Sequence, residues 1–164
     1  MIFSEQWLRE WVSPELETQQ LIDELTMAGL EVDSSMPVAR QCSGIVVGLV
    51  ESVEPHPDAD KLSLCSVSDG EESFQVVCGA PNVRAGIKAP FAKLGATIIE
   101  SLGAKPFKIK KAKIRGVESN GMLCSSEELG LEESSDGLLV LHENANVGED
   151  IRSSLKLDDT SIEL

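Results

Sequence analysis

The chain has 164 residues, which fits one ordinary domain or one domain with a small companion and excludes a large multidomain enzyme for this chain by itself. Hydrophobic residues make up 41% of the sequence, enough to form a buried core, which excludes global disorder. The 28 acidic and 14 basic residues give a net charge of −14, which repels polyanions at long range and excludes a bulk nucleic-acid binder. No apolar run approaches the ~20 residues of a membrane span, and no secretory leader follows Met1. We therefore expect a cytoplasmic protein with no membrane partner.

The first 40 residues predict two short helices. Ser4 is the expected N-cap of the first, whose apolar residues recur with helical spacing at Trp7, Leu8, Trp11 and Val12. We expect this stripe, including both tryptophans, to lie in the hydrophobic core. Thr18 is the expected cap of the second helix and Gly29 its C-terminal stop.

From about Gly44 the pattern changes to short β-rich runs separated by turn-forming residues. Six strands are predicted, at residues 45–53, 62–67, 74–77, 89–99, 108–114 and 138–141. Strands this short and this close together cannot be joined by parallel crossovers. The sequence therefore predicts a mainly β fold with an antiparallel β-barrel of the oligonucleotide-binding (OB) type.

The end of the chain resembles its beginning, with a short helical segment over residues 149–155 and an alternating pattern at residues 162–164. We expect this last segment to pair near residues 30–33 and complete a small α+β domain split around the barrel. The predicted organisation is residues 1–40 for the first part of the split domain, 41–148 for the OB-fold domain and 149–164 for the return segment.

Basic residues concentrate in one short segment. Residues 105–115 contain six of the 14 basic residues and no acidic residue, namely Lys105, Lys108, Lys110, Lys111, Lys113 and Arg115. Strand alternation places these cations on one face if a β-bulge near Lys110 and Lys111 shifts the alternation by one residue. Such a row can follow a phosphate chain, although a solvated edge strand protected by lysines is an alternative interpretation.

The sequence offers few aromatic residues beyond those needed for packing, so we expect recognition of a folded RNA through its backbone and shape rather than stacking along a single strand. Common catalytic motifs are absent, and Cys42, Cys65, Cys78 and Cys124 contain no CxxC pair, so we interpret them as reduced core thiols and expect no metal site. Asp58 and Asp60, beside two prolines, are expected to hold a loop by hydrogen bonding.

Several segments carry a resemblance to a known family. They include FSEQWLREWV (3–12), LTMAGLEVD (25–33), HPDADKL (56–62), VCGAPNVR (77–84), KIKKAKIRGVESNGMLCSSEELG (108–130) and the closing LKLDDTSIEL. Together they resemble the N-terminal region of the bacterial phenylalanyl-tRNA synthetase β subunit. The central part is also similar to tRNA-binding OB-fold modules, which share an HPxAD loop and a KxRG followed by SxGM.

The resemblance implies a tRNA-binding module that contributes to tRNA(Phe) binding in an α2β2 enzyme. In this family the α subunit uses ATP and magnesium, so no catalytic residue and no cofactor are expected in this chain. The expected tRNA-binding residues are the six cations and Ser119, whose hydroxyl can also hydrogen-bond the backbone. Asn82 and Arg84 form a second polar candidate that a structural turn explains equally well.

Two functions remain open from the sequence. One is the tRNA-binding module, which predicts salt-sensitive binding. The other is a protein-interaction or assembly module of the synthetase without strong tRNA contact, in which the lysines pair with acidic residues of a partner subunit.

Overall fold

The computed structural model describes residues 1–99 and 104–164, which form two compact units. The first unit comprises Met1–Ala39 and Leu157–Leu164, and the second comprises Arg40–Lys156. Every strand pairing described is antiparallel, which confirms the mainly β expectation. Residues 149–156, which the sequence analysis groups with the return segment, lie in the second unit.

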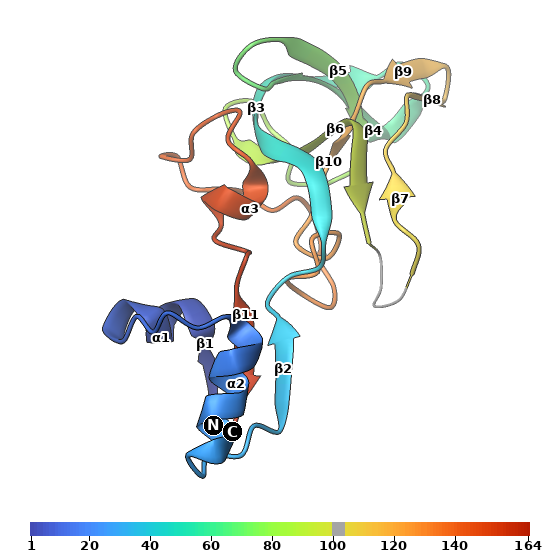
Figure 1. Ribbon diagram of the computed structural model, residues 1–164. Coiled ribbons are helices and arrows are strands. Elements are labelled where there is room, and N and C mark those ends of the chain that lie inside the picture. The colour runs from blue at the N-terminus through green and yellow to red at the C-terminus, as the bar shows by residue number, and fades with distance from the viewer. Residues whose placement is uncertain (100–103) are drawn as a thin grey trace. The chain divides into compact units, whose positions relative to one another are not determined.

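The first unit is built on a three-stranded sheet in the order β1-β11-β2 (Figure 1). Its strands are β1 (Ile2–Ser4), β2 (Ser34–Pro37) and β11 (Thr160–Glu163). The last strand therefore pairs with Ser34–Pro37, a few residues beyond the expected partner at residues 30–33. Because β11 lies between strands from the start of the chain, the sheet joins the two ends of the sequence in one unit.

Two helices flank this sheet in the sequence, α1 (Glu5–Trp11) and α2 (Thr18–Met27). Ser4 caps α1 as expected, because its Oγ accepts a hydrogen bond from the N–H of Trp7 at 3.0 Å. The N-cap of α2 is Glu17, one residue before the expected Thr18, and it forms a capping box with Gln20. The Thr18 hydroxyl instead donates to Glu5.

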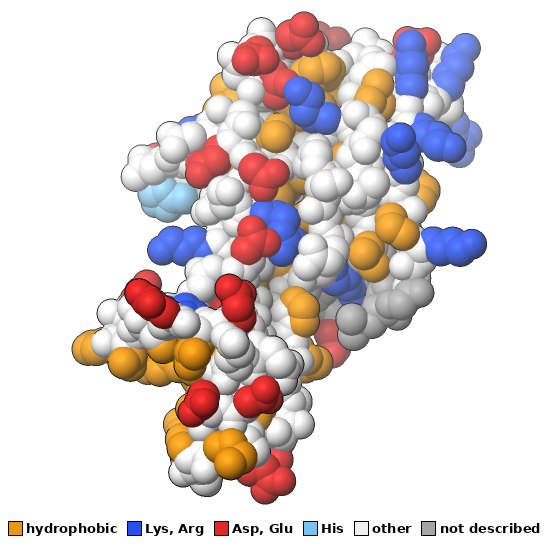
Figure 2. Space-filling model, in the orientation of Figure 1, with side chains coloured by type: hydrophobic (Ala, Val, Ile, Leu, Met, Phe, Trp, Pro, Cys, Tyr) orange, Lys and Arg blue, Asp and Glu red, His pale blue; other side chains and the backbone are white. Residues whose placement is uncertain are grey.

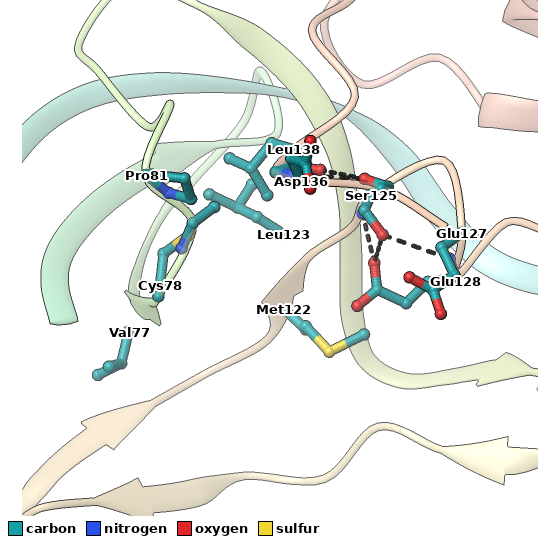
Figure 3. Close-up of a pocket in the computed structure, with 14 residues that line it drawn as sticks. Val77, Cys78, Pro81, Met122, Leu123, Ser125, Glu127, Glu128, Asp136 and Leu138 are labelled. Atoms are coloured by element: carbon teal, nitrogen blue, oxygen red, sulfur yellow. Dashed lines mark hydrogen bonds between the residues drawn. The ribbon is translucent and has the colours of Figure 1, made fainter. Parts of the chain in front are cut away.

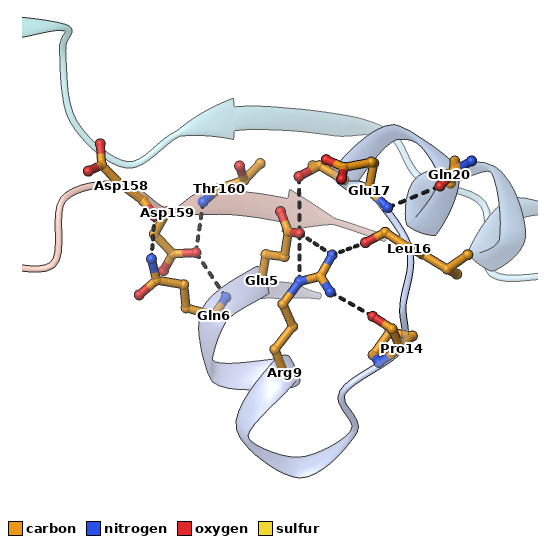
Figure 4. Close-up of polar contacts among 11 residues, drawn as sticks. Glu5, Gln6, Arg9, Pro14, Leu16, Glu17, Gln20, Asp158, Asp159 and Thr160 are labelled. Carbon is orange, nitrogen blue, oxygen red and sulfur yellow. Dashed lines mark hydrogen bonds and ion pairs between the residues drawn. The ribbon is translucent and has the colours of Figure 1, made fainter.

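A buried carboxylate joins the two helices (Figure 4). Glu5, which is only 6% exposed, forms an ion pair with Arg9 at 2.8 Å and accepts the Thr18 hydroxyl at 3.0 Å. Arg9 also donates to the carbonyl groups of Pro14 and Leu16. The guanidinium of Arg9 therefore pairs with the buried carboxylate and also provides hydrogen bonds to two carbonyl groups of the loop between the helices. A buried charge needs such a partner because its removal from water is unfavourable.

The expectation that both tryptophans lie in the core is wrong. Trp7 is 56% exposed and Trp11 76% exposed, and their rings contact each other edge-on with centroids 6.4 Å apart. The helical spacing was correct, but the small unit buries Leu21 and Ile162, whereas Leu8 of the α1 stripe is only partly buried and Val12 is exposed. Periodicity identifies the apolar face of a helix without identifying what covers that face.

The second unit contains the larger sheet, in the order β10-β6-β3-β4-β5 with β7 also paired to β6. Its strands are β3 (Cys42–His56), β4 (Ala59–Ser68), β5 (Ser73–Cys78), β6 (Lys88–Ile98), β7 (Phe107–Lys108) and β10 (Met122–Leu123). A separate hairpin is formed by β8 (Ala112–Ile114) and β9 (Val117–Ser119). The short helix α3 (Ile151–Ser154) lies within the predicted helical segment 149–155.

The large sheet curves so that its two ends approach each other (Figure 1). The N–H of Asn120, between β9 and β10, donates to the carbonyl of Gln75 on β5 at 2.8 Å, and the N–H of Val77 donates to Ser119 Oγ at 3.0 Å. The curved sheet surrounds a core that includes Val50, Val67 and Phe91, each 0% exposed.

Two predicted strands differ from the structure. Residues 108–114 form two short strands, β7 and β8, rather than one. Residues 138–141 contain no regular strand, although Leu139 and Leu141 donate backbone hydrogen bonds to Cys124 and Lys88. Leu138 and Leu141 are buried, so their apolar pattern reflects packing rather than ladder pairing.

Candidate nucleic-acid interface

The six cations of residues 105–115, here called the cationic segment, are all exposed. Lys108 belongs to β7, Lys113 to β8 and Arg115 to the turn after β8, and the other three lie next to these strands. Lys and Arg side chains gather in Figure 2 along the edge where Figure 1 places β7, β8 and β9. The segment therefore presents consecutive positive charges to solvent.

A break between two strands, rather than a β-bulge, produces the shift in side-chain alternation. Ile109 is buried at 5% exposure and still pairs with β6, because its N–H and carbonyl bond to Ala96 and Gly95 at 2.8 Å. Residues 110 and 111 then leave the β6 ladder, and β8 begins a new pairing with β9. The chain passes from the β6 ladder to the β8–β9 hairpin at this point. All six cations can therefore be exposed without the regular alternation of side chains along one strand. Ala112, the first residue of β8, is also exposed.

Most of the cationic segment is free of internal ion pairs. Lys111 forms one with Glu118 at 2.9 Å, and both side chains are about half exposed, at 54% and 55%. Within the described part of the chain, the other five cations have no carboxylate partner within ion-pair distance. An exposed pair of this kind is worth about 0–1 kcal/mol, so a phosphate can compete for Lys111.

A tight turn connects β8 to β9 and carries the last cation. Ile114 pairs with Val117, so Arg115 and Gly116 form a two-residue loop in which both have positive φ, 50° and 86°. Two positive φ values define a type I′ turn, whose twist matches that of antiparallel strands. Gly116 adopts this conformation readily, whereas Arg115 adopts it at a steric cost.

A buried histidine attaches the hairpin to the loop between β3 and β4. His56 is 4% exposed, its Nδ1 accepts the N–H of Asp58 at 3.0 Å, and its Nε2 lies 3.0 Å from the carbonyl oxygen of Ile114. Because a backbone N–H can only donate, Nδ1 is the acceptor and the neutral ring carries its proton on Nε2, which donates to Ile114. His56 therefore fixes the HPDAD loop against β8.

Sequence reasoning did not find this role of His56. The loop was expected to be held by Asp58 and Asp60, whose side chains are exposed. The sequence did offer one related signal, because the HPxAD and KxRG motifs occur together, in this order, in the family that the chain resembles. Neither motif by itself shows that the ring of one reaches the backbone of the other.

Ser119, a predicted contact residue, is buried at 3% exposure. Its Oγ accepts the N–H of Val77 and donates to the carbonyl of Gly121, both at 3.0 Å. The hydroxyl thus makes backbone hydrogen bonds, which was one of the two roles predicted for it, and it faces the interior rather than solvent. We therefore leave Ser119 out of the contact surface.

Asn82 and Arg84 lie outside the cationic segment, on the loop between β5 and β6. Asn82 binds both backbone groups of Leu138, donating to its carbonyl at 2.9 Å and accepting its N–H at 2.8 Å. Arg84 is exposed and donates to the Asn82 carbonyl at 3.5 Å. Asn82 is thus a structural clamp that holds the 138–141 segment.

The Asn82 loop also borders a pocket of about 400 Å³ (Figure 3). Its apolar side includes Pro81 and Leu123, and its polar side carries Glu127, Glu128 and Asp136. Figure 3 shows the hydroxyl and N–H of Ser125 donating to Glu128. Three carboxyl groups make this pocket unsuitable for a phosphate, so the cationic segment is the better anion site.

Three of the four cysteines are buried and all four are free thiols. Burial, together with the nearby Cys78, raises the pKa of Cys65 to about 11, and burial also raises the pKa of Cys78 and Cys124. A thiol with a raised pKa is a poor nucleophile. Cys42 differs from the expected core position because it is partly exposed.

Over residues 1–99 and 104–164, no helix is both long and apolar enough to cross a bilayer. The same ranges hold no group of three or more His, Cys, Asp and Glu side chains placed to bind a metal ion.

Comparisons with known proteins identify a family and several relatives of this chain. Residues 45–150 match the family described as "Putative tRNA binding domain". The phenylalanine–tRNA ligase β subunits of Hahella chejuensis and Acinetobacter baylyi are 64% and 53% identical over 164 and 165 residues, which is all of this chain and 20% of each relative. A MetRS-related protein from Pyrococcus horikoshii has a solved structure with 25% identity and a TM-score of 0.46, covering 83% of this chain and 97% of its own.

The chain thus spans about one fifth of the length of the curated relatives that it matches. Its similarity to the N-terminal region of the phenylalanine–tRNA ligase β subunit extends over its whole length, which confirms the resemblance drawn from the motifs. With its β-rich unit matched over residues 45–150, the chain belongs to the tRNA-binding domain family.

Proposed function

We propose that the chain binds tRNA through the cationic segment, with the lysines and Arg115 neutralising backbone phosphates. The observation that carries this proposal is a row of exposed cations, five of which form no ion pair with a carboxylate of the described residues, on a chain with a net charge of −14. Because the rest of the surface repels a polyanion, the RNA is directed to this edge. The guanidinium of Arg115 can make a bidentate phosphate contact at the tip of the hairpin.

The longer enzyme is also part of the proposal. The relatives support a role in binding tRNA(Phe) during aminoacylation, in the cytoplasm and within an α2β2 assembly with the α subunit. We assign ATP and magnesium to parts of that enzyme outside this chain. The second unit, Arg40–Lys156, would be the tRNA-contacting OB-fold domain, and the first unit, Met1–Ala39 with Leu157–Leu164, the split companion domain.

Salt-dependent binding tests the proposed surface. If about five phosphates are neutralised, the logarithm of the tRNA association constant falls against the logarithm of salt concentration with a slope of roughly −3.5 to −4.5. We expect Lys110→Glu and Lys113→Glu each to weaken binding and to make the slope less steep by about one. The measurement is a fluorescence titration with tRNA(Phe) over a range of salt concentrations.

The matched control is Lys156→Glu, which makes the same charge change at an exposed residue outside the cationic segment. We expect it to leave the slope unchanged. Equal weakening by Lys113→Glu and Lys156→Glu would show that net charge alone acts and would contradict the proposed surface.

A second role, contact with another protein of the synthetase, is supported by the first unit. Its exposed apolar side chains gather partly along α1 (Figure 2) and comprise Met1, Ile2, Trp7, Trp11, Val12, Met27, Leu30, Met36 and Val38. Among them, the Trp7 and Trp11 rings contact each other on α1, and exposed apolar side chains that gather in this way mark an interaction site. We assign it to contact with the α subunit.

Variants of the two surfaces separate the two roles. Trp7→Ser with Trp11→Ser is expected to weaken co-purification with the α subunit and to leave tRNA affinity unchanged, because neither residue lies near the cationic segment in the sequence or belongs to its unit. Lys113→Glu is expected to do the opposite. Undiminished association of the tryptophan variant would overturn the assembly role.

A further inference from the structure

One aromatic side chain of the second unit is exposed, and it lies among the cations. Phe107 on β7 is 52% exposed, whereas Phe91 is fully buried and Phe74 partly buried against it, with ring centroids 5.4 Å apart. The other exposed aromatic residues within the described ranges, Trp7 and Trp11, belong to the first unit. Phe107 is therefore the exposed ring of the described second unit, and Lys105 and Lys108 lie on either side of it in the sequence.

The surroundings of Phe107 form a shallow hollow with an apolar floor and a cationic rim. The hollow has a volume of about 420 Å³ and is lined by Pro106, Phe107, Lys108, Lys110, Lys111 and Ala112. This volume falls in the range of roughly 300–1,000 Å³ that is common for small-molecule sites. On the same edge, Figure 2 shows hydrophobic side chains bordered by Lys and Arg side chains.

Backbone pairing holds this hollow in place. Phe107 and Lys108 pair with Ile98 and Thr97 of β6, and Ile109 continues the pairing through two hydrogen bonds of 2.8 Å. The buried side chain of Ile109 anchors the segment from below. The ring of Phe107 is therefore presented on an ordered strand rather than on a free loop.

The combination of an exposed ring and flanking lysines fits one kind of ligand. A nucleobase stacks on an aromatic side chain through its π-face, while ammonium groups bind the phosphates on either side of it. A base-paired helix cannot offer such a face, because its bases are already stacked on each other, whereas loops and ends of a folded RNA can. A protein partner with acidic side chains would satisfy the lysines but would not explain an aromatic platform between them.

We propose that Phe107 stacks on one unpaired base of the bound RNA, with Lys108 and Lys110 on the adjacent phosphates. This inference rests on the proposed function and adds to it a specific contact, an unpaired nucleotide. The Phe107 ring would contact one base, whereas the other proposed contacts are made to the phosphate backbone of the RNA. This contact thus modifies the expectation from composition, which left few aromatic residues free for stacking.

The test compares three substitutions at Phe107 with two RNA probes. Phe107→Leu keeps an apolar side chain but removes the π-face, and Phe107→Ala removes both, whereas Phe107→Trp keeps a stacking platform. The probes are tRNA(Phe) and a fully base-paired RNA duplex of similar length. Because Phe107 is half exposed, thermal unfolding of each variant verifies that the fold is retained.

We expect Phe107→Leu and Phe107→Ala to bind tRNA(Phe) roughly 5- to 100-fold more weakly than the wild type, and Phe107→Trp to bind it about as tightly. Affinity for the duplex and the salt slope for tRNA are expected to stay unchanged, because no charge is altered. Equal tRNA affinity of Phe107→Leu and the wild type would overturn the stacking contact. If Lys110→Glu still weakened binding in that case, the proposed function would stand, and if it did not, both proposals would fail.

Discussion

At the scale of single residues, His56 connects a loop motif to the candidate interface. Its ring makes one hydrogen bond to the loop, at Asp58, and one to the carbonyl of Ile114 on the hairpin. Removing the ring leaves the partly buried carbonyl of Ile114 and the N–H of Asp58 without these partners. An unsatisfied buried group of this kind costs about 1–3 kcal/mol.

We therefore expect His56→Ala to lower the free energy of unfolding by about 1–3 kcal/mol, measured by urea denaturation. His142→Ala is the control, because His142 is exposed and its Nδ1 accepts the nearby N–H of Asn144 at 3.1 Å. Its effect should stay within about 0.5 kcal/mol, as for most surface substitutions. Equal effects of the two substitutions would refute the linking role of His56.

Asp69 is a second residue with a defined electrostatic role. Asp69 is only 7% exposed, and its carboxylate accepts a hydrogen bond from the Lys93 ammonium at 2.5 Å. It also accepts hydrogen bonds from the backbone N–H groups of Glu71 and Glu72, at 3.0 and 2.9 Å. The hydrogen bond from Lys93, followed by those from the backbone, lowers the pKa of Asp69 from 3.8 to about 2. Lys93 also lies 5.6 Å from the centre of the Phe74 ring.

A lowered pKa makes the contribution of Asp69 depend on pH in a defined direction. The stabilisation is fully present above the unfolded-state pKa of 3.8 and is lost as the pH falls toward the folded-state value of about 2. Asp69→Asn should therefore lower the free energy of unfolding by about 1–3 kcal/mol at neutral pH, and this difference should disappear between about pH 4 and pH 2. Glu71→Gln, the same type of change at an exposed residue, is the control, and its effect at neutral pH should stay within about 0.5 kcal/mol in urea denaturation.

At the scale of elements, the β8–β9 hairpin combines a cation with an unfavourable backbone conformation. Arg115 has a φ of 50°, which costs a residue with a β-carbon roughly 1–2 kcal/mol and which Asn tolerates better. Strain of this kind is retained at functional sites. The backbone of the turn would be less strained with Asn at position 115. The fold therefore does not require the positive charge of Arg115, which we attribute to binding.

Arg115→Asn should separate stability from binding. We expect the free energy of unfolding to stay equal or rise by about 0.5–1 kcal/mol, because Asn suits the turn, while the salt slope for tRNA becomes less steep by about one. Thermal unfolding and salt titration measure the two effects. A loss of both stability and slope would instead indicate that the guanidinium supports the hairpin structurally.

The second glycine of this region has a different reason to be glycine. Gly121 has a φ of 140°, and a β-carbon there would lie 2.5 Å from the buried Phe91 ring. At Gly116, by contrast, a β-carbon would meet no atom within 4 Å. The conformation of the turn therefore requires glycine at 116, whereas the closeness of β10 to the core requires it at 121.

At the scale of the whole molecule, the same charge distribution acts in opposite directions on folding and on binding. With a net charge of −14, the acidic side chains of the folded protein repel one another. Salt screens this repulsion, with a Debye length of about 10 Å at 0.1 M. Salt also weakens the contact of the cationic segment with phosphates. One change of solvent thus stabilises the protein and weakens the proposed complex.

We expect the melting temperature to rise by a few degrees between about 20 and 500 mM NaCl, while tRNA affinity falls steeply over the same range. Differential scanning fluorimetry and fluorescence titration measure the two quantities on the same samples. A melting temperature that falls with added salt would mean that ion pairs contribute more to stability than the net repulsion takes away.

The sequence by itself determined the class of the fold, the N-cap of α1 and the location of the charge. Ser4 caps α1, the strands of residues 45–53, 62–67 and 74–77 lie within β3, β4 and β5, and all six cations of the cationic segment are exposed. These features depend on local propensity and on the avoidance of burying unpaired charge, both of which act within a few residues.

The tertiary structure decided which surfaces face solvent and which distant groups meet. It left Trp7, Trp11 and Phe107 exposed, buried Ser119 and placed the His56 ring against the backbone of Ile114. It also divided residues 108–114 between two sheets. Periodicity gives the direction of each side chain relative to its own element, but burial depends on what other parts of the chain lie opposite, which no local pattern contains.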